Sequence, residues 1–146
     1  MAGTATPIYP QTLKDWAVQI LPADTTTLKT LVTGAANGSK LEMLNITSTD
    51  TAGRDVQVWM TISAVDYLIA TLNIPINSGN TNAILAQGLL ASLVNTAPYL
   101  PYFQFPLDVN GNRYIYVASG SVLKVSCLTT VTAAKSINFL AIGGDF

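Results

Sequence analysis

The stretch DVNGNRYIYVASGSVLKVSCLTTVTAAKSINFLAIGGDF, residues 108–146, decides the fold. Its runs of Val, Ile, Leu, Tyr and Phe have the length and composition of strands, and its breaks fall at Gly, Ser and Asn. This pattern predicts strands over 113–117, 121–129 and 135–142, joined by tight turns. A sheet made of them needs a second sheet to cover it, so we expect the upstream chain to supply further strands.

The upstream chain carries several segments of strand composition. The clearest is 56–63, where Val56, Val58 and Met60 alternate with more polar residues. Pro75 near the end of another segment indicates a strand at a sheet edge. The full set of upstream strands predicted in this way is 16–21, 27–33, 39–49, 56–63 and 66–74.

Within 39–49 the alternation changes phase. Leu41 and Met43 share one face, whereas Leu44 and Ile46 share the other. Two explanations stay open at this point: a β-bulge near Met43, or a strand that is covered on both faces.

Three segments do not follow the strand pattern. Residues 1–12, MAGTATPIYPQT, predict an extended arm with Ile8 and Tyr9 as its anchors, a disordered tail being the alternative. Apolar residues at helical spacing predict one short helix over 83–93 despite Gly88. The proline-rich run 97–107 is expected to cover one end of the core.

These segments together predict the fold class. We expect an all-β protein, an antiparallel β-sandwich of about eight strands for which a jelly roll is one candidate arrangement. The sandwich forms a single domain over 13–146, preceded by the arm and interrupted by the short helix.

Composition excludes several kinds of partner. Apolar residues make up 49% of the chain and charged residues only 10%, well below the roughly 25% of an ordinary soluble domain. The seven basic residues are scattered singly, which argues against a nucleic-acid partner. No apolar run approaches the roughly 18 residues of a membrane span, so no membrane partner is expected.

The chain offers no visible catalytic chemistry. It contains no His, and its single Cys127 lies in a strand-like run, where we expect a buried and inert thiol. The eight acidic residues are dispersed, so we predict no enzyme, no metal site and no cofactor. Asp108-Val109-Asn110-Gly111-Asn112 resembles the start of a calcium loop, but a turn built on Asn110-Gly111 explains these residues more simply.

Five residues are candidates for a protein interface. Trp59 lies on an otherwise polar strand face, where it is either half-covered by a loop or part of a subunit contact. The others are aromatic or aliphatic residues outside the strand pattern. The complete candidate set is Ile8, Tyr9, Trp59, Tyr99 and Tyr102.

Residues 106–117, PLDVNGNRYIYV, and 120–125, GSVLKV, resemble small virion structural proteins of tailed bacteriophages. The ending AIGGDF at 141–146 and the middle segment 38–52 fit the same pattern, so the resemblance spans about residues 27 to 146. It implies a β-sandwich that decorates, or cements, the outside of the head. The implied partners are the major capsid protein and further copies of the chain, as a homotrimer. The implied location is the capsid surface, after synthesis in the bacterial host cytoplasm.

Two other functions stay open. A neck, collar or tail component belongs to the same structural class. A carbohydrate-binding module is a different class, in which Trp59, Tyr99 and Tyr102 would stack on sugar rings.

Overall fold

The computed structural model describes residues 9–90 and 105–146. The chain forms strands and a single 3₁₀ turn within these ranges. In order they are β1 Thr12–Ile20, the 3₁₀ turn Pro22–Asp24, β2 Lys29–Thr33, β3 Ser39–Ser48, β4 Arg54–Ile62, β5 Val65–Ile74, β6 Gln87–Gly88, β7 Ile115–Val117, β8 Val122–Cys127 and β9 Ile137–Asp145.

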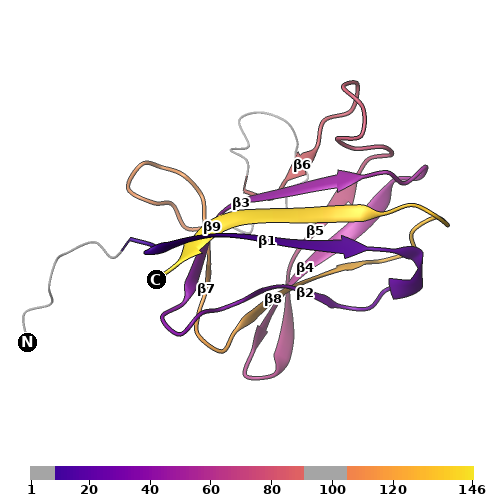
Figure 1. The fold of residues 1–146 in the computed structure, drawn as a ribbon. Helices are drawn as coiled ribbons and strands as arrows, with labels where there is room; N and C mark the ends of the chain where they lie inside the picture. Colours follow the sequence, from indigo (N-terminus) through magenta and orange to yellow (C-terminus); the bar gives the residue numbers. More distant parts are fainter. Residues whose placement is uncertain (1–8, 91–104) are drawn as a thin grey trace, which may run out of the picture.

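The strands form two antiparallel sheets packed face to face, which confirms the predicted sandwich (Figure 1). One sheet has the order β1-β9-β3-β6, with β7 also paired to β3, and the other has the order β2-β8-β4-β5. Because β6 and β7 both run antiparallel to β3 along the same edge, they take the place of one interrupted strand. With that substitution the strand order is that of an eight-stranded jelly roll.

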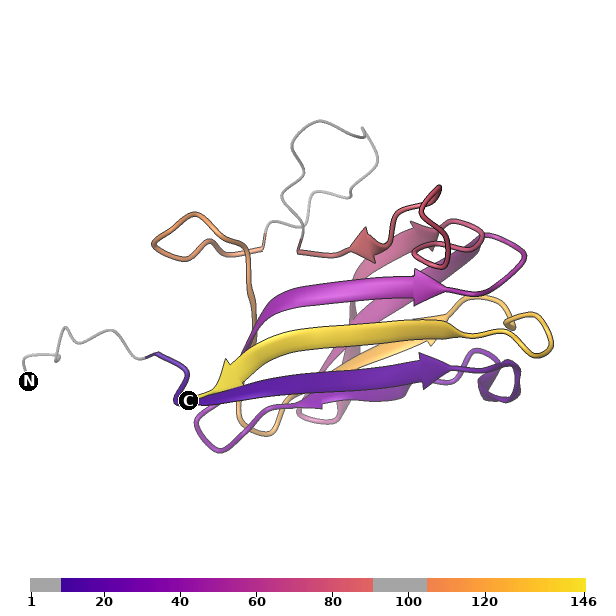
Figure 2. The same ribbon diagram turned by 45° about the horizontal axis from the view of Figure 1, so that its top comes forward.

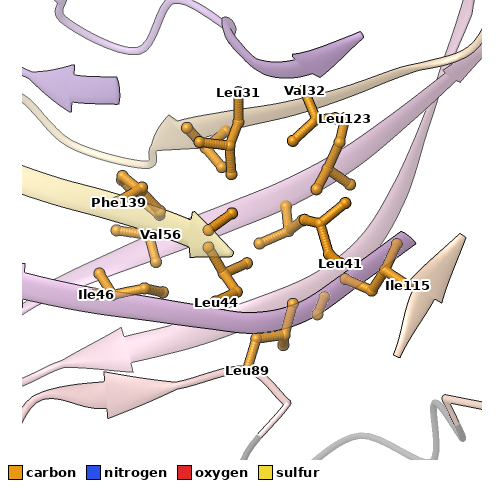
Figure 3. Close-up of a cluster of buried hydrophobic side chains, with 14 of the residues drawn as sticks. Leu31, Val32, Leu41, Leu44, Ile46, Val56, Leu89, Ile115, Leu123 and Phe139 are labelled. Atoms are coloured by element: carbon orange, nitrogen blue, oxygen red, sulfur yellow. The ribbon is translucent and has the colours of Figure 1, made fainter. Parts of the chain in front are cut away.

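The core lies between the sheets and consists of the inward residues of both. Ile137, Phe139 and Ala141 of β9 are buried and alternate with outward residues, as a strand with one covered face requires. Figure 3 shows aliphatic side chains from both sheets, among them Leu44, Val56 and Leu123, in one cluster with Phe139. Cys127 is buried in this core as predicted, and burial raises the pKa of its thiol.

A β-bulge in β3 explains the phase change seen in the sequence. The pairing of β3 with β9 shifts between Leu41 and Met43, so Glu42 is the extra residue. Leu41 and Leu44 therefore both point into the core, while Met43 points outward. The close approach at the bulge needs Gly143, because a Cβ atom there would lie 1.9 Å from the Lys40 carbonyl oxygen.

The helix predicted over 83–93 is wrong for residues 83–90. Gln87 and Gly88 pair with Ile46 and Asn45 of β3, and the following residue, Leu89, donates its N–H to the Leu44 carbonyl at 3.1 Å. The apolar residues that suggested a helical face, Leu89 and Leu90, are instead buried against the core from an extended chain. A free sheet edge supplied the hydrogen bonds, so tertiary pairing overrode the local periodicity.

The first strand begins earlier than its apolar residues indicate. β1 starts at Thr12, and Gln11 already donates its N–H to the Asp145 carbonyl at 2.8 Å. The last residues of the predicted arm therefore belong to the sheet. The apolar pattern does not indicate this part of the strand, because it contains the charged residues Lys14 and Asp15. Both side chains are exposed along a sheet edge.

Asp50 ties three loops together at one end of the sandwich. Its buried carboxylate accepts hydrogen bonds from Arg54 Nε at 2.7 Å, from Thr132 Oγ1 at 2.5 Å and from the Thr132 and Ala52 N–H groups. Its carbonyl accepts the Asn77 N–H at 3.0 Å. Burial alone would raise the pKa of this carboxyl, but the hydrogen bonds from Arg54, Thr132 and Ala52 hold it well below the ordinary value of 3.8.

We predict that Asp50→Asn lowers the free energy of unfolding at neutral pH by about 3 kcal/mol, because Arg54 then stays mostly buried without its counter-charge. A depressed pKa contributes stability above the unfolded-state value and loses it as the pH falls. The wild type should therefore lose more stability than the variant between about pH 4 and about pH 2.

Urea titrations at several pH values measure both effects. Asp15→Asn, at an exposed position on β1, is the control and should stay within about 0.5 kcal/mol of the wild type. An Asp50→Asn variant with the same acid dependence as the wild type would contradict the assignment.

The β4–β5 hairpin turns through two residues that are ill suited to its geometry. Ile62 pairs with Val65, and the turn residues Ser63 and Ala64 have φ of 51° and 65°. Two positive φ angles are typical of a type I′ turn, which prefers Asn-Gly. Left-handed backbone costs an ordinary residue roughly 1–2 kcal/mol.

We predict that the double substitution Ser63→Asn and Ala64→Gly raises the free energy of unfolding by about 1 kcal/mol, since both new residues accept the left-handed region. Thermal and urea unfolding measure the gain. Ala133→Gly, at an exposed alanine outside the positive-φ set, should lower stability instead. A loss of stability in the double variant would refute the assignment of strain to this turn.

Candidate protein interface

The outer face of the five-stranded sheet carries an apolar band across three neighbouring strands. In the register of the sheet, Leu140 of β9 lies between Ala17 of β1 and Asn45 of β3. One step along, Ile142 lies between Asp15 and Met43. These positions alternate with the core residues of the same strands, so their side chains point away from the core. We define the outer band as the exposed residues Leu13, Ala17, Met43, Leu140 and Ile142.

The outer band exists because β9 is apolar on both faces. Its run Phe139-Leu140-Ala141-Ile142 sends two residues into the core and two outward, and both outward residues are exposed, by 39% and 44%. The bulge at Glu42 then turns Met43 toward the same side. A contiguous exposed apolar surface on a rigid sheet is typical of a protein-binding site.

The polar groups on this face are largely occupied by one another. Gln19 Nε2 donates to Asn138 Oδ1 at 2.6 Å, and Asn138 Nδ2 donates to Thr47 Oγ1 at 3.4 Å. At the opposite end of the face, Lys40 lies 2.8 Å from the Glu42 carboxylate. The face therefore presents apolar groups together with several polar side chains that already have partners, and one exposed carboxylate, Asp15, opposite Ile142.

Pro10, just before β1, lies against Gly144 at the far end of this face. A Cβ atom on Gly144 would lie 2.7 Å from Cβ of Pro10, so the glycine makes room for the proline. Tyr9, which is 68% exposed, borders a groove of about 680 Å³ beside it. Lys40, Tyr114, Tyr116 and Phe146 also line this groove, together with residues 106–110.

The aromatic wall of the groove is held in place by its own contacts. The rings of Tyr116 and Phe146 lie 5.9 Å apart and are tilted by 55°. Lys40 Nζ lies 5.1 Å from the centre of the Tyr114 ring, within cation–π range. Tyr116 donates its hydroxyl to the Asn37 carbonyl at 3.1 Å. Tyr9 thus lies next to ordered aromatic rings, in a groove that Lys40 and Glu42 also line.

The segment that resembled a calcium loop is a turn, as predicted. Asp108 Oδ1 accepts the N–H groups of Asn110 and Asn112 at 2.9 and 2.8 Å, and Gly111 takes a positive φ of 81°. These bonds, led by the one from the Asn112 N–H, lower the pKa of the Asp108 carboxyl. Across residues 9–90 and 105–146, no group of three His, Cys, Asp or Glu side chains is placed to hold a metal ion.

Trp59 lies on the outer face of the other sheet. It is opposite Leu68 of β5 and Lys124 of β8, and its indole N–H donates to Ser126 Oγ at 3.3 Å. Its side chain is half-buried by neighbouring strands. Two of the predicted interface residues therefore do not form one surface, since Tyr9 lies beside the five-stranded sheet and Trp59 lies on the four-stranded sheet. Ile8, Tyr99 and Tyr102 lie outside the described residues.

The residues of the outer band are not among the interface residues predicted from the sequence, most of which are aromatic. A signal was present, because four consecutive apolar residues from Phe139 to Ile142 cannot all be buried by one neighbouring sheet.

In the described part of the chain, no helix is long and apolar enough to cross a membrane.

The chain was compared with known protein families, curated proteins and solved structures. No protein-family model matches the chain, and searches of the curated proteins and of the solved structures gave no match.

Proposed function

We propose that this protein is a structural component of a tailed-phage virion that binds the outside of the head and stabilises it. The observation that carries the proposal is the outer band, an apolar surface on a rigid sheet that holds one exposed carboxylate, Asp15. In the proposed complex the outer band packs against the major capsid protein. The resemblance of the strand and turn motifs to phage virion proteins supports the same function.

Energetics favour apolar contacts over charge for this attachment. Burying an exposed Leu, Ile or Met side chain contributes roughly 1.5–3 kcal/mol, whereas an exposed ion pair contributes about 0–1 kcal/mol. Two of the ion pairs nearest the outer band, Lys40–Glu42 and Lys14–Asp145, are already formed within the chain. The outer band can therefore supply most of the binding energy of a single copy.

The strand order supports the proposal without deciding it. Jelly rolls form viral capsid domains, and they also form lectins, so this fold accommodates both a particle protein and a sugar-binding module. Of the three aromatic residues expected to stack on sugars, Trp59 is the one within the described residues, and it is half-buried on the four-stranded sheet. The outer band, in contrast, is an exposed apolar surface suited to another protein.

The proposal extends to partners and to location. The protein would be made in the host cytoplasm and would join the capsid surface as a homo-oligomer, a trimer by the resemblance. It would need no nucleic acid, membrane, cofactor or catalytic residue. Tyr9 and Pro10, which belong to the predicted arm 1–12, lie beside the sheet that carries the outer band.

We predict that Leu140→Lys lowers the number of copies on purified heads at least about tenfold, because a charge would be buried at the centre of the contact. Cryo-electron microscopy of particles assembled with each variant measures occupancy and position. Leu128→Lys, an equally exposed leucine outside the outer band, is the matched control and should bind like the wild type.

Three results would contradict this proposal. Full occupancy of Leu140→Lys would exclude the outer band as the docking surface. Density at the portal vertex or along the tail would make the protein a neck or tail component. A protein absent from particles that binds oligosaccharides in solution would be a carbohydrate-binding module.

We also predict that release from particles changes little between low salt and about 1 M salt, where the Debye length is about 3 Å. Apolar contacts are not screened by salt, and multivalent binding slows loss further. Pelleting particles after incubation and measuring free protein gives the result. Release that rises steeply with salt would show an electrostatic contact instead.

A further inference from the structure

The end of the β4–β5 hairpin is apolar on both of its faces. Ile62, Val65, Tyr67 and Leu68 are each about half exposed, by 48%, 51%, 53% and 49%. We call these four residues the hairpin end. It belongs to the four-stranded sheet and is separate from the outer band, which lies on the five-stranded sheet.

Three of these side chains are exposed although they lie on the core-facing side of their strands. Ile62 pairs with Val65, and Met60 pairs with Tyr67, in phase with the buried Val58. The neighbouring strand β8 pairs with β4 only as far as Thr61, so the Ile62–Val65 pair extends past it. Figures 1 and 2 show the hairpin projecting beyond the strands beside it. Leu68, opposite Trp59, adds an apolar residue on the other side.

The hairpin end also has a free strand edge. β5 is the last strand of its sheet, and among the described strands it pairs with β4 alone. Natural edge strands are usually protected by Lys, Pro or inward-pointing charges. β5 has no Lys or Pro, and the bulge at Ile69, another protective device, leaves Val65–Leu68 as a regular segment beside the turn.

The single charge on this segment is already neutralised within the chain. The Asp66 carboxylate accepts a hydrogen bond from Thr61 Oγ1 at 2.5 Å and lies 3.0 Å from Lys124 Nζ. The segment therefore presents apolar side chains and backbone groups to a partner, with no unpaired charge. The turn residues Ser63 and Ala64 both have positive φ, and backbone strain of this kind clusters at functional sites.

We propose that the hairpin end is the contact between copies of this chain. A second copy suits it because a neutral surface does not repel its own duplicate, and because the free edge of β5 can pair with the same edge of another copy about a twofold axis. Such a contact joins copies in pairs, and it is separate from the threefold contact of a trimer. A strongly charged partner would gain nothing from a segment whose one carboxylate is already paired. The contact concerns the protein in solution and holds whether or not the protein coats a phage head.

Sedimentation velocity on the full chain, over about 1 to about 200 μM, tests the proposal across weak to moderate affinities. The wild type should form an oligomer whose mass gives the number of copies. Val65→Lys should weaken self-association at least about tenfold, because it places a charge in the contact. Val109→Lys, at a 96% exposed valine in the Asp108 turn, is the matched control and should associate like the wild type.

Hydrogen exchange on the wild type gives a second, independent measurement. Amides of residues 65–68 should exchange more slowly at high than at low protein concentration, which decides the matter even if Val65→Lys does not fold. The proposal would be overturned if the wild type stayed monomeric at every concentration, or if the Val65→Lys variant formed the same oligomer. It would also be overturned if the exchange rates of amides 65–68 did not change with protein concentration. Loss of head binding in Leu140→Lys with self-association unchanged would show that the two surfaces act separately.

Discussion

The pairing of β9 between β1 and β3 is the interaction on which the rest of the structure depends. Residues 137–145 bond on one side to the first strand and on the other to the third, closing a loop that spans most of the chain. Closing so long a loop costs conformational entropy, which the burial of Ile137, Phe139 and Ala141 offsets. Without β9 the five-stranded sheet would have no centre and the other sheet no cover.

The same strand also gives the protein its candidate docking face. β9 is paired along both of its edges, so the backbone that carries its outward residues is held in place. Leu140 and Ile142 use that rigidity, and little conformational entropy remains to be lost when a partner covers them. The core and the proposed interface are two faces of one strand.

The two proposed contacts lie on different sheets, and this separation suits a protein that binds a shell and its own copies together. The outer band belongs to β1, β3 and β9, whereas the hairpin end belongs to β4 and β5. Asp50 joins the loops β3–β4, β5–β6 and β8–β9, which connect strands of both sheets. Binding at one surface therefore need not disturb the other, because the core and this buried cluster keep the sheets in a fixed relation.

The sequence by itself determined the fold class, most strand positions and the turn at Asn110-Gly111, because alternation and turn residues are local properties of the chain. It also indicated an irregularity near Met43, without choosing between a bulge and a two-sided strand. Only the tertiary structure decided that Leu89 and Leu90 pack from an extended segment, that Leu140 faces outward from a core strand, and that Tyr67 lacks a covering strand. Each of these features depends on which strands, distant in the sequence, lie beside the residue in the folded protein. The order of apolar residues along the chain does not contain that information.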